Sequence, residues 1–66
     1  MKFTREDNNT ILANTRRYIS RSSKDMALQA TLAQLKKLTM IKSYEDTAIV
    51  NNCIKYLRRE VKHLVG

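Results

Sequence analysis

Proline is absent from this chain of 66 residues, and glycine occurs once, as the terminal Gly66. Tight hairpins usually need glycine or asparagine-glycine at the turn, so these absences argue against a multi-stranded sheet. The lack of an internal glycine also excludes a glycine-rich loop wrapped around a nucleotide phosphate. What remains is a set of helices joined by short connections.

Cysteine and histidine occur once each, as Cys53 and His63. One cysteine cannot form an intramolecular disulfide, and these two side chains are too few for a zinc site within one chain. They lie ten positions apart, about 15 Å along a helix, so they cannot pair as nucleophile and base. We therefore expect no metal, no cofactor, no small-molecule substrate and no enzymatic activity.

Long apolar runs are also missing: nothing approaches the roughly eighteen residues of a membrane span. The chain turns polar directly after its first residues and shows no secretory leader. A single unpaired thiol is typical of a reducing compartment. These features predict a cytoplasmic protein that does not act at a membrane.

Acidic residues are scarce, with 6 Asp and Glu against 13 Lys and Arg, a net charge of +7. A balance this basic in a small chain points to an anionic partner, either nucleic acid or an acidic protein surface. A basic face that only keeps the protein in solution is the alternative.

Apolar residues recur at helical spacing in three segments, roughly 4–21, 23–40 and 43–65. Each segment opens with a hydroxyl residue that can cap a helix: Thr4, Ser22 or Ser23, and Ser43. Five of the six acids would then lie in first turns, where the helix dipole favours them: Glu6, Asp7, Asp25, Glu45 and Asp46. With short connections, residues 1–66 are predicted to form one all-α domain, a small three-helix up-down bundle.

The apolar stripes differ in width. The first helix offers Ile11, Leu12, Tyr18 and Ile19, with Thr15 between them. The second offers Leu28, Leu32, Leu35 and Leu38, in a stripe widened by Ala27 and Thr31. The third carries the widest stripe: Ile49, Val50, Cys53, Ile54, Leu57, Val61, Leu64 and Val65. This surplus, and a second patch of Met26, Ala30 and Ala33 on the back of the second helix, predict a homodimer, because a single core of this size is marginal.

An up-down bundle places the ends of the first and third helices at one pole. The cations expected there, and proposed to contact phosphates, are Arg16, Arg17, Arg21, Lys24, Arg58, Arg59 and Lys62. Within the third helix, Asn51, Asn52 and Lys55 are the candidates for contacts with bases. Helix dipoles favour some cations at these ends, but they do not require so many without an acid among them.

Two functions fit this pattern. The first is a non-enzymatic regulatory protein that binds nucleic acid or another polyanion through the basic pole. The second is a protein-binding inhibitor or adaptor of the kind that phages and mobile elements encode. Such a protein would dock on an acidic surface, or in a nucleic-acid channel, of a host protein.

The stretch "KSYEDTAIVNNCIKYLRREV" resembles the second helix of the ribbon-helix-helix family, which would make the preceding "RRYISR" a strand. A strand should alternate apolar and polar side chains, yet Ile19 shares its face with Arg17 and Arg21. The turn glycine of that family is also missing, so we assign no family from the sequence.

Overall fold

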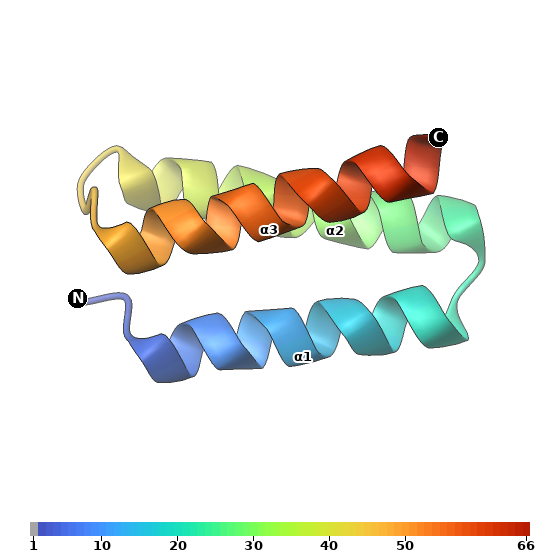
Figure 1. Cartoon of the computed structure of the whole chain (residues 1–66), viewed down its shortest axis with the longest axis horizontal. Coiled ribbons are helices and arrows are strands. Elements are labelled where there is room, and N and C mark those ends of the chain that lie inside the picture. Colours follow the sequence, from blue (N-terminus) through green and yellow to red (C-terminus); the bar gives the residue numbers. More distant parts are fainter. Residues whose placement is uncertain (1) are drawn as a thin grey trace.

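The protein is a bundle of three α-helices, seen in a computed structural model that describes residues 2–66. The helices are α1 (Arg5–Arg21), α2 (Lys24–Lys42) and α3 (Ala48–Val65). α1 and α3 run in the same direction and α2 runs opposite to both (Figure 1). No strand occurs among the described residues, and "RRYISR" lies within α1. The predicted all-α up-down architecture is confirmed, whereas a ribbon-helix-helix strand is excluded.

The first two helices begin where their capping residues predict. The Thr4 hydroxyl accepts the Asp7 N–H at 3.2 Å and the Asp7 carboxylate accepts the Thr4 N–H at 2.9 Å, a complete capping box. This hydrogen bond from the Thr4 backbone is the main reason why the pKa of Asp7 lies below its usual value. Ser23 caps α2 by accepting the N–H of Met26. Both caps satisfy backbone donors that the first turn leaves free.

The predicted start of the third helix at Ser43 is wrong. Ser43 ends α2, and Thr47 caps α3 by accepting the N–H of Val50 at 3.3 Å. Glu45 and Asp46 therefore precede α3 and do not lie in its first turn. The reason is tertiary: the Glu45 carboxylate accepts the backbone N–H of Phe3, at the other end of the chain. A local pattern of hydroxyl and acid cannot reveal such a contact.

The predicted apolar stripe of α2 faces the core, but only part of it is fully buried. Ala27, Thr31 and Leu38 are buried, whereas Leu32 is 44% exposed. The small side chains of Ala27 and Thr31 on the inner face let neighbouring helices approach closely, while Leu28 and Leu35 are half-buried. The hydroxyl of Thr31 is satisfied within its own helix, donating to the Ala27 carbonyl at 2.8 Å.

The core is otherwise built mainly by α3, as its wide stripe predicts. Val50, Cys53 and Leu57 are essentially inaccessible to solvent, and Ile54 is buried beside them. The far end of the predicted stripe is wrong, since Val65, the last residue of α3, is 62% exposed. From α1 only Ile11 and Thr15 are buried. Of its other predicted core residues, Leu12 and Ile19 are half-buried and Tyr18 is 50% exposed.

Two buried polar atoms lack a hydrogen-bond partner: the side-chain oxygens of Asn8 on α1 and Gln34 on α2 have no donor among residues 2–66. A buried acceptor without a partner lowers stability by roughly 1–3 kcal/mol.

Replacing Gln34 by methionine, which has a similar length and no such acceptor, is expected to raise the free energy of unfolding by about 1 kcal/mol. Urea denaturation measures this. The matched control is Gln29→Met at an exposed position of α2, where we expect a change within about 0.5 kcal/mol. Equal effects of the two substitutions would contradict a specific cost at Gln34.

Candidate polyanion-binding surface

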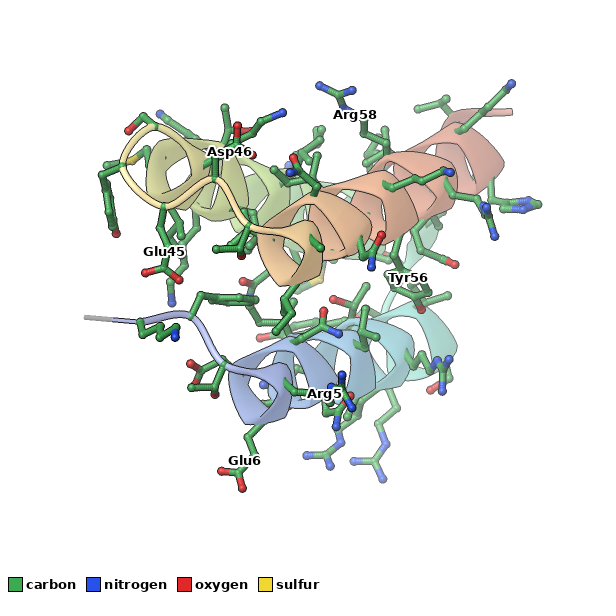
Figure 2. All side chains as sticks on the ribbon, turned by 60° about the vertical axis from the view of Figure 1, so that its left-hand side comes forward. Arg5, Glu6, Glu45, Asp46, Tyr56 and Arg58 are labelled. Atoms are coloured by element: carbon green, nitrogen blue, oxygen red, sulfur yellow. The ribbon has the colours of Figure 1, made fainter. Side chains whose placement is uncertain are left out.

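Four cations of α3 lie on its solvent-facing side. Lys55, Arg58, Arg59 and Lys62 are all exposed, and at about 100° per residue they share an arc of roughly 100°. The buried positions Val50, Cys53, Ile54 and Leu57 occupy the opposite side of the same helix. We call these four cations the α3 basic stripe. Figure 2 shows that Arg58 points outward, away from α1.

Glu60, the one acid in the body of α3, does not interrupt this stripe. It is half-buried, and helical geometry places it roughly 100° beyond Arg59. Glu60 lies on the same side of the helix as Tyr56, which Figure 2 places between α3 and α1. The outer side of α3 is therefore purely cationic over about two turns.

One arginine of α1 reaches α3. The Arg16 guanidinium lies 5.9 Å from the centre of the Tyr56 ring, and its Nε donates to the Tyr56 hydroxyl over a long 3.4 Å. Tyr56 is half-buried and packs against the core, so it is a core-edge residue, as its place in the apolar pattern predicts. A cation over an exposed aromatic face contributes about 0.5–1 kcal/mol, enough to orient Arg16 beside α3.

The other two arginines of α1 border a hollow of their own. Arg17 and Arg21 line a shallow hollow with Asn14, Tyr18 and Ser22, and α3 contributes nothing to its lining. The reason is helical geometry: consecutive residues are rotated by about 100°, so Arg16 and Arg17 cannot both face α3. Parallel helices bring their ends to one pole without bringing all their side chains to one face.

Lys24 and His63 are the remaining basic residues at this end of the bundle. Lys24 is the first residue of α2 and His63 lies in the last turn of α3, and both are exposed. The helix dipole favours His63 at its position and disfavours Lys24 at the start of a helix. The helix dipole therefore does not explain the position of Lys24, whereas contact with an anionic partner would.

The two asparagines of α3 differ in their freedom to contact a base. The Asn51 amide nitrogen donates to the Asp46 carboxylate at 2.7 Å and to the Thr47 carbonyl at 3.0 Å. Both of its N–H groups are therefore committed to holding the start of α3. Asn52 is exposed and, with Lys55, is the better placed candidate for a base contact.

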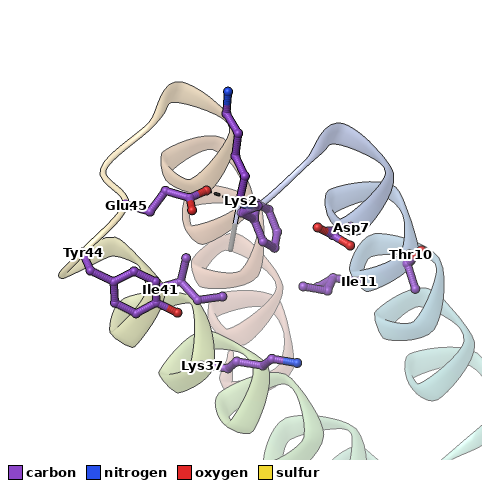
Figure 3. Close-up of a pocket in the computed structure, with 9 residues that line it drawn as sticks. Lys2, Asp7, Thr10, Ile11, Lys37, Ile41, Tyr44 and Glu45 are labelled. Atoms are coloured by element: carbon purple, nitrogen blue, oxygen red, sulfur yellow. Dashed lines mark hydrogen bonds between the residues drawn. The ribbon is translucent and has the colours of Figure 1, made fainter.

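A cavity of about 260 Å³ lies at the opposite end of the bundle, and no sequence pattern predicts it (Figure 3). Phe3, Ile11 and Ile41 contribute its apolar lining, and Lys2 and Lys37 also border it. Its two carboxylates are already engaged: Asp7 caps α1, and Glu45 holds the backbone of Phe3. Phe3 is only 8% exposed. The cavity therefore lies where these contacts hold the N-terminal segment against the core.

Cys53 is a buried core residue and its environment is apolar. Burial raises the pKa of its thiol to about 11, from an ordinary value of 9.0. A thiol with a raised pKa is a poor nucleophile and a poor metal ligand at neutral pH. Among residues 2–66, no three His, Cys, Asp or Glu side chains are grouped closely enough to hold a metal ion.

This raised pKa predicts a loss of stability in alkali. The unfolded chain releases the Cys53 proton near pH 9, the folded chain only near pH 11, so stability falls as pH rises between these values. The loss should total roughly 2–3 kcal/mol, from about 1.4 kcal/mol per pH unit. Urea denaturation at pH 8 and pH 11 measures it, and Cys53→Ala should remove this component. An equal alkaline loss in both proteins would assign it to other groups.

No helix within residues 2–66 combines the length and the apolar character that a membrane span requires. Comparison of the chain with protein-family models, with curated proteins and with solved structures finds no match.

Proposed function

We propose that this is a non-enzymatic protein that binds nucleic acid or another polyanion through the outer side of α3. The observation that carries the proposal is the α3 basic stripe, in which Lys55, Arg58, Arg59 and Lys62 are exposed side by side without an acid among them. Four like charges on one short helical surface repel one another. An anionic partner turns this repulsion into attraction.

The dimensions of the stripe suit a phosphate backbone. From Lys55 to Lys62 the helix rises by about 10 Å, which corresponds to roughly three base-pair steps at 3.4 Å each. Arginine binds phosphate oxygens with two parallel donors, and the stripe supplies two arginines. Arg16, held at the side of α3 by Tyr56, would extend the contact surface toward α1. Contacts of this kind give affinity with little sequence preference.

Fluorescence anisotropy with a labelled DNA duplex and a labelled single-stranded RNA tests the proposal. About four phosphate contacts predict an affinity that falls roughly a hundredfold between 50 and 200 mM salt, from a slope of about −0.9 per contact. Binding to neither nucleic acid at the lower salt concentration would refute nucleic acid as the partner. The stripe would then be tested against an acidic protein surface, for which affinity does not depend on nucleic-acid length.

We further propose that the protein forms a homodimer through the exposed face of α2. Met26 and Met40 are 61% and 63% exposed, and each lies seven residues from Ala33. Seven residues are almost two turns, so all three share one face, with Ala30 beside them. In an antiparallel pair centred on Ala33, the small alanine permits close approach and Met26 of one copy meets Met40 of the other.

Sedimentation velocity over a range of protein concentrations tests the dimer. The surface is small, so the association should be weak, with a dissociation constant on the order of micromolar or above. Ala33→Glu should give a monomer at every concentration, because it places two carboxylates at the centre of the contact. A wild-type protein that is monomeric throughout would exclude this dimer.

Two further elements of the proposal, the absence of catalysis and the cytoplasmic location, rest on the cysteine and histidine of the chain. The separation of Cys53 from His63 and the raised pKa of Cys53 favour a role without catalysis. A single free thiol suits a cytoplasmic protein, because such thiols persist in a reducing compartment.

A further inference from the structure

Arg17 and Arg21 have no evident structural role. They are four residues apart on α1, both are exposed, and they line the shallow hollow of about 290 Å³ with Asn14, Tyr18 and Ser22. None of these five lining residues is acidic. Two cations at this spacing repel by a few tenths of a kcal/mol. The α1 dipole favours a cation in its last turn, which explains the position of Arg21 but not that of Arg17.

The hollow has the donors that a phosphate group requires. Each guanidinium presents a planar fork of N–H groups, and phosphate is one of the anions that this fork fits best. Tyr18 and Ser22 add hydroxyl donors beside the two arginines, and Asn14 adds an amide. α1 ends and α2 begins at this point, so the negative end of one helix dipole lies close to the positive end of the next. These two dipole ends offset each other, so the local electrostatic potential is set mainly by the two arginine charges.

This hollow and the α3 basic stripe face opposite sides of the molecule. Figure 2 shows Glu6 pointing away from α3 below α1, and Arg58 pointing away from α1 above α3. Arg17 follows Glu6 by eleven residues, or three turns plus about 20°, so it shares the direction of Glu6. The bundle measures 19 and 14 Å across its two shorter dimensions. An arginine on one side cannot reach a phosphate that is bound on the other.

We infer that Arg17 and Arg21 form a second phosphate-binding site, so that one chain can hold two nucleic-acid segments, one on each side. This inference rests on the proposed function, because the first segment is the one bound by α3. The second site has two arginines where the α3 basic stripe has four cations. Its contribution to affinity should change only about tenfold between 50 and 200 mM salt, and it should be the weaker of the two sites.

Energy transfer between two DNA duplexes, one carrying a donor dye and the other an acceptor, tests this inference. Added to an equal mixture, the wild-type protein should raise energy transfer at low ratios of protein to duplex. Excess protein should lower it again, because each duplex then receives its own chain. Anisotropy of the donor-labelled duplex in the same samples reports binding to a single duplex. The double variant Arg17→Gln with Arg21→Gln should lose the transfer signal and keep most of the single-duplex affinity.

The control with the same change of charge is Arg5→Gln with Lys42→Gln, at exposed positions of α1 and α2. It should keep the transfer signal. Transfer that persists in the arginine variant would overturn the second site and assign bridging to two α3 stripes in a dimer. Single-duplex binding without any transfer in the wild type would also overturn the second site, while leaving the proposed function intact. Absence of single-duplex binding would overturn both.

Discussion

Arg58→Glu combined with Arg59→Glu should abolish nucleic-acid binding while the helical content stays unchanged. Both side chains are exposed on α3, on the side opposite the buried Val50, Cys53, Ile54 and Leu57. Their replacement therefore leaves the core untouched. The change removes two of the four cations of the α3 basic stripe and places two carboxylates beside the phosphates. Loss of the contacts and the added repulsion together should weaken binding by roughly a hundredfold or more at 50 mM salt.

Anisotropy gives the affinity, and circular dichroism reports whether the helices are retained. The matched control is Arg5→Glu with Lys42→Glu, at exposed positions of α1 and α2, which lowers the net charge from +7 to +3, the same as in the arginine variant. If binding depends on the α3 basic stripe, the control should lose far less affinity. Equal losses in the two proteins would show that only total charge matters, and would remove Arg58 and Arg59 from a defined site.

Leu57→Ala should destabilise the fold more than any substitution at the surface. Leu57 has no exposed area and belongs to the core cluster with Leu38, Val50 and Cys53. Truncating a leucine in such a site costs about 2–5 kcal/mol, from the lost burial and the cavity left behind. A loss of this size should lower the midpoint of thermal unfolding by about 10 °C or more, because each kcal/mol shifts it by roughly 4–8 °C in a domain of this length.

Thermal unfolding followed by circular dichroism measures this effect. The control is Val65→Ala, in the same helix but 62% exposed, where the loss should stay within about 0.5 kcal/mol. A loss at Leu57 as small as that at Val65 would mean that the core does not depend on this contact between α3 and its neighbours.

Local signals predicted the helices where nothing distant intervened. Thr4 with Asp7, and Ser23 before Lys24, begin α1 and α2 as expected, because a cap is decided by three or four consecutive residues. Ser43, Glu45 and Asp46 carry a similar local signature but do not begin α3. Glu45 is instead drawn to the backbone of Phe3, 42 residues away. Phe3 itself escaped prediction as a core residue because it lies outside any helix and so outside any periodic pattern.

The candidate surfaces divide in the same way. The α3 basic stripe was predictable, because all four cations belong to one helix and their relative directions follow from a fixed rotation per residue. Whether Arg16, Arg17 and Arg21 lie beside that stripe was not predictable from the sequence. Their directions depend on how α1 is rotated about its own axis relative to α3. The Tyr56 contact directs Arg16 to α3, and the same rotation turns Arg17 away from it.

The sequence by itself determined the all-α class, the number of helices, their up-down order and the outward basic side of α3. Each of these follows from local propensity, spacing and short connections, which operate over a few residues. Only the tertiary structure decided where α3 starts, which residues of the α2 stripe are fully buried, and that Arg17 and Arg21 lie away from the α3 basic stripe. These features depend on the rotation and close approach of whole helices, which small residues such as Ala27 and Thr31 permit and which no single segment encodes.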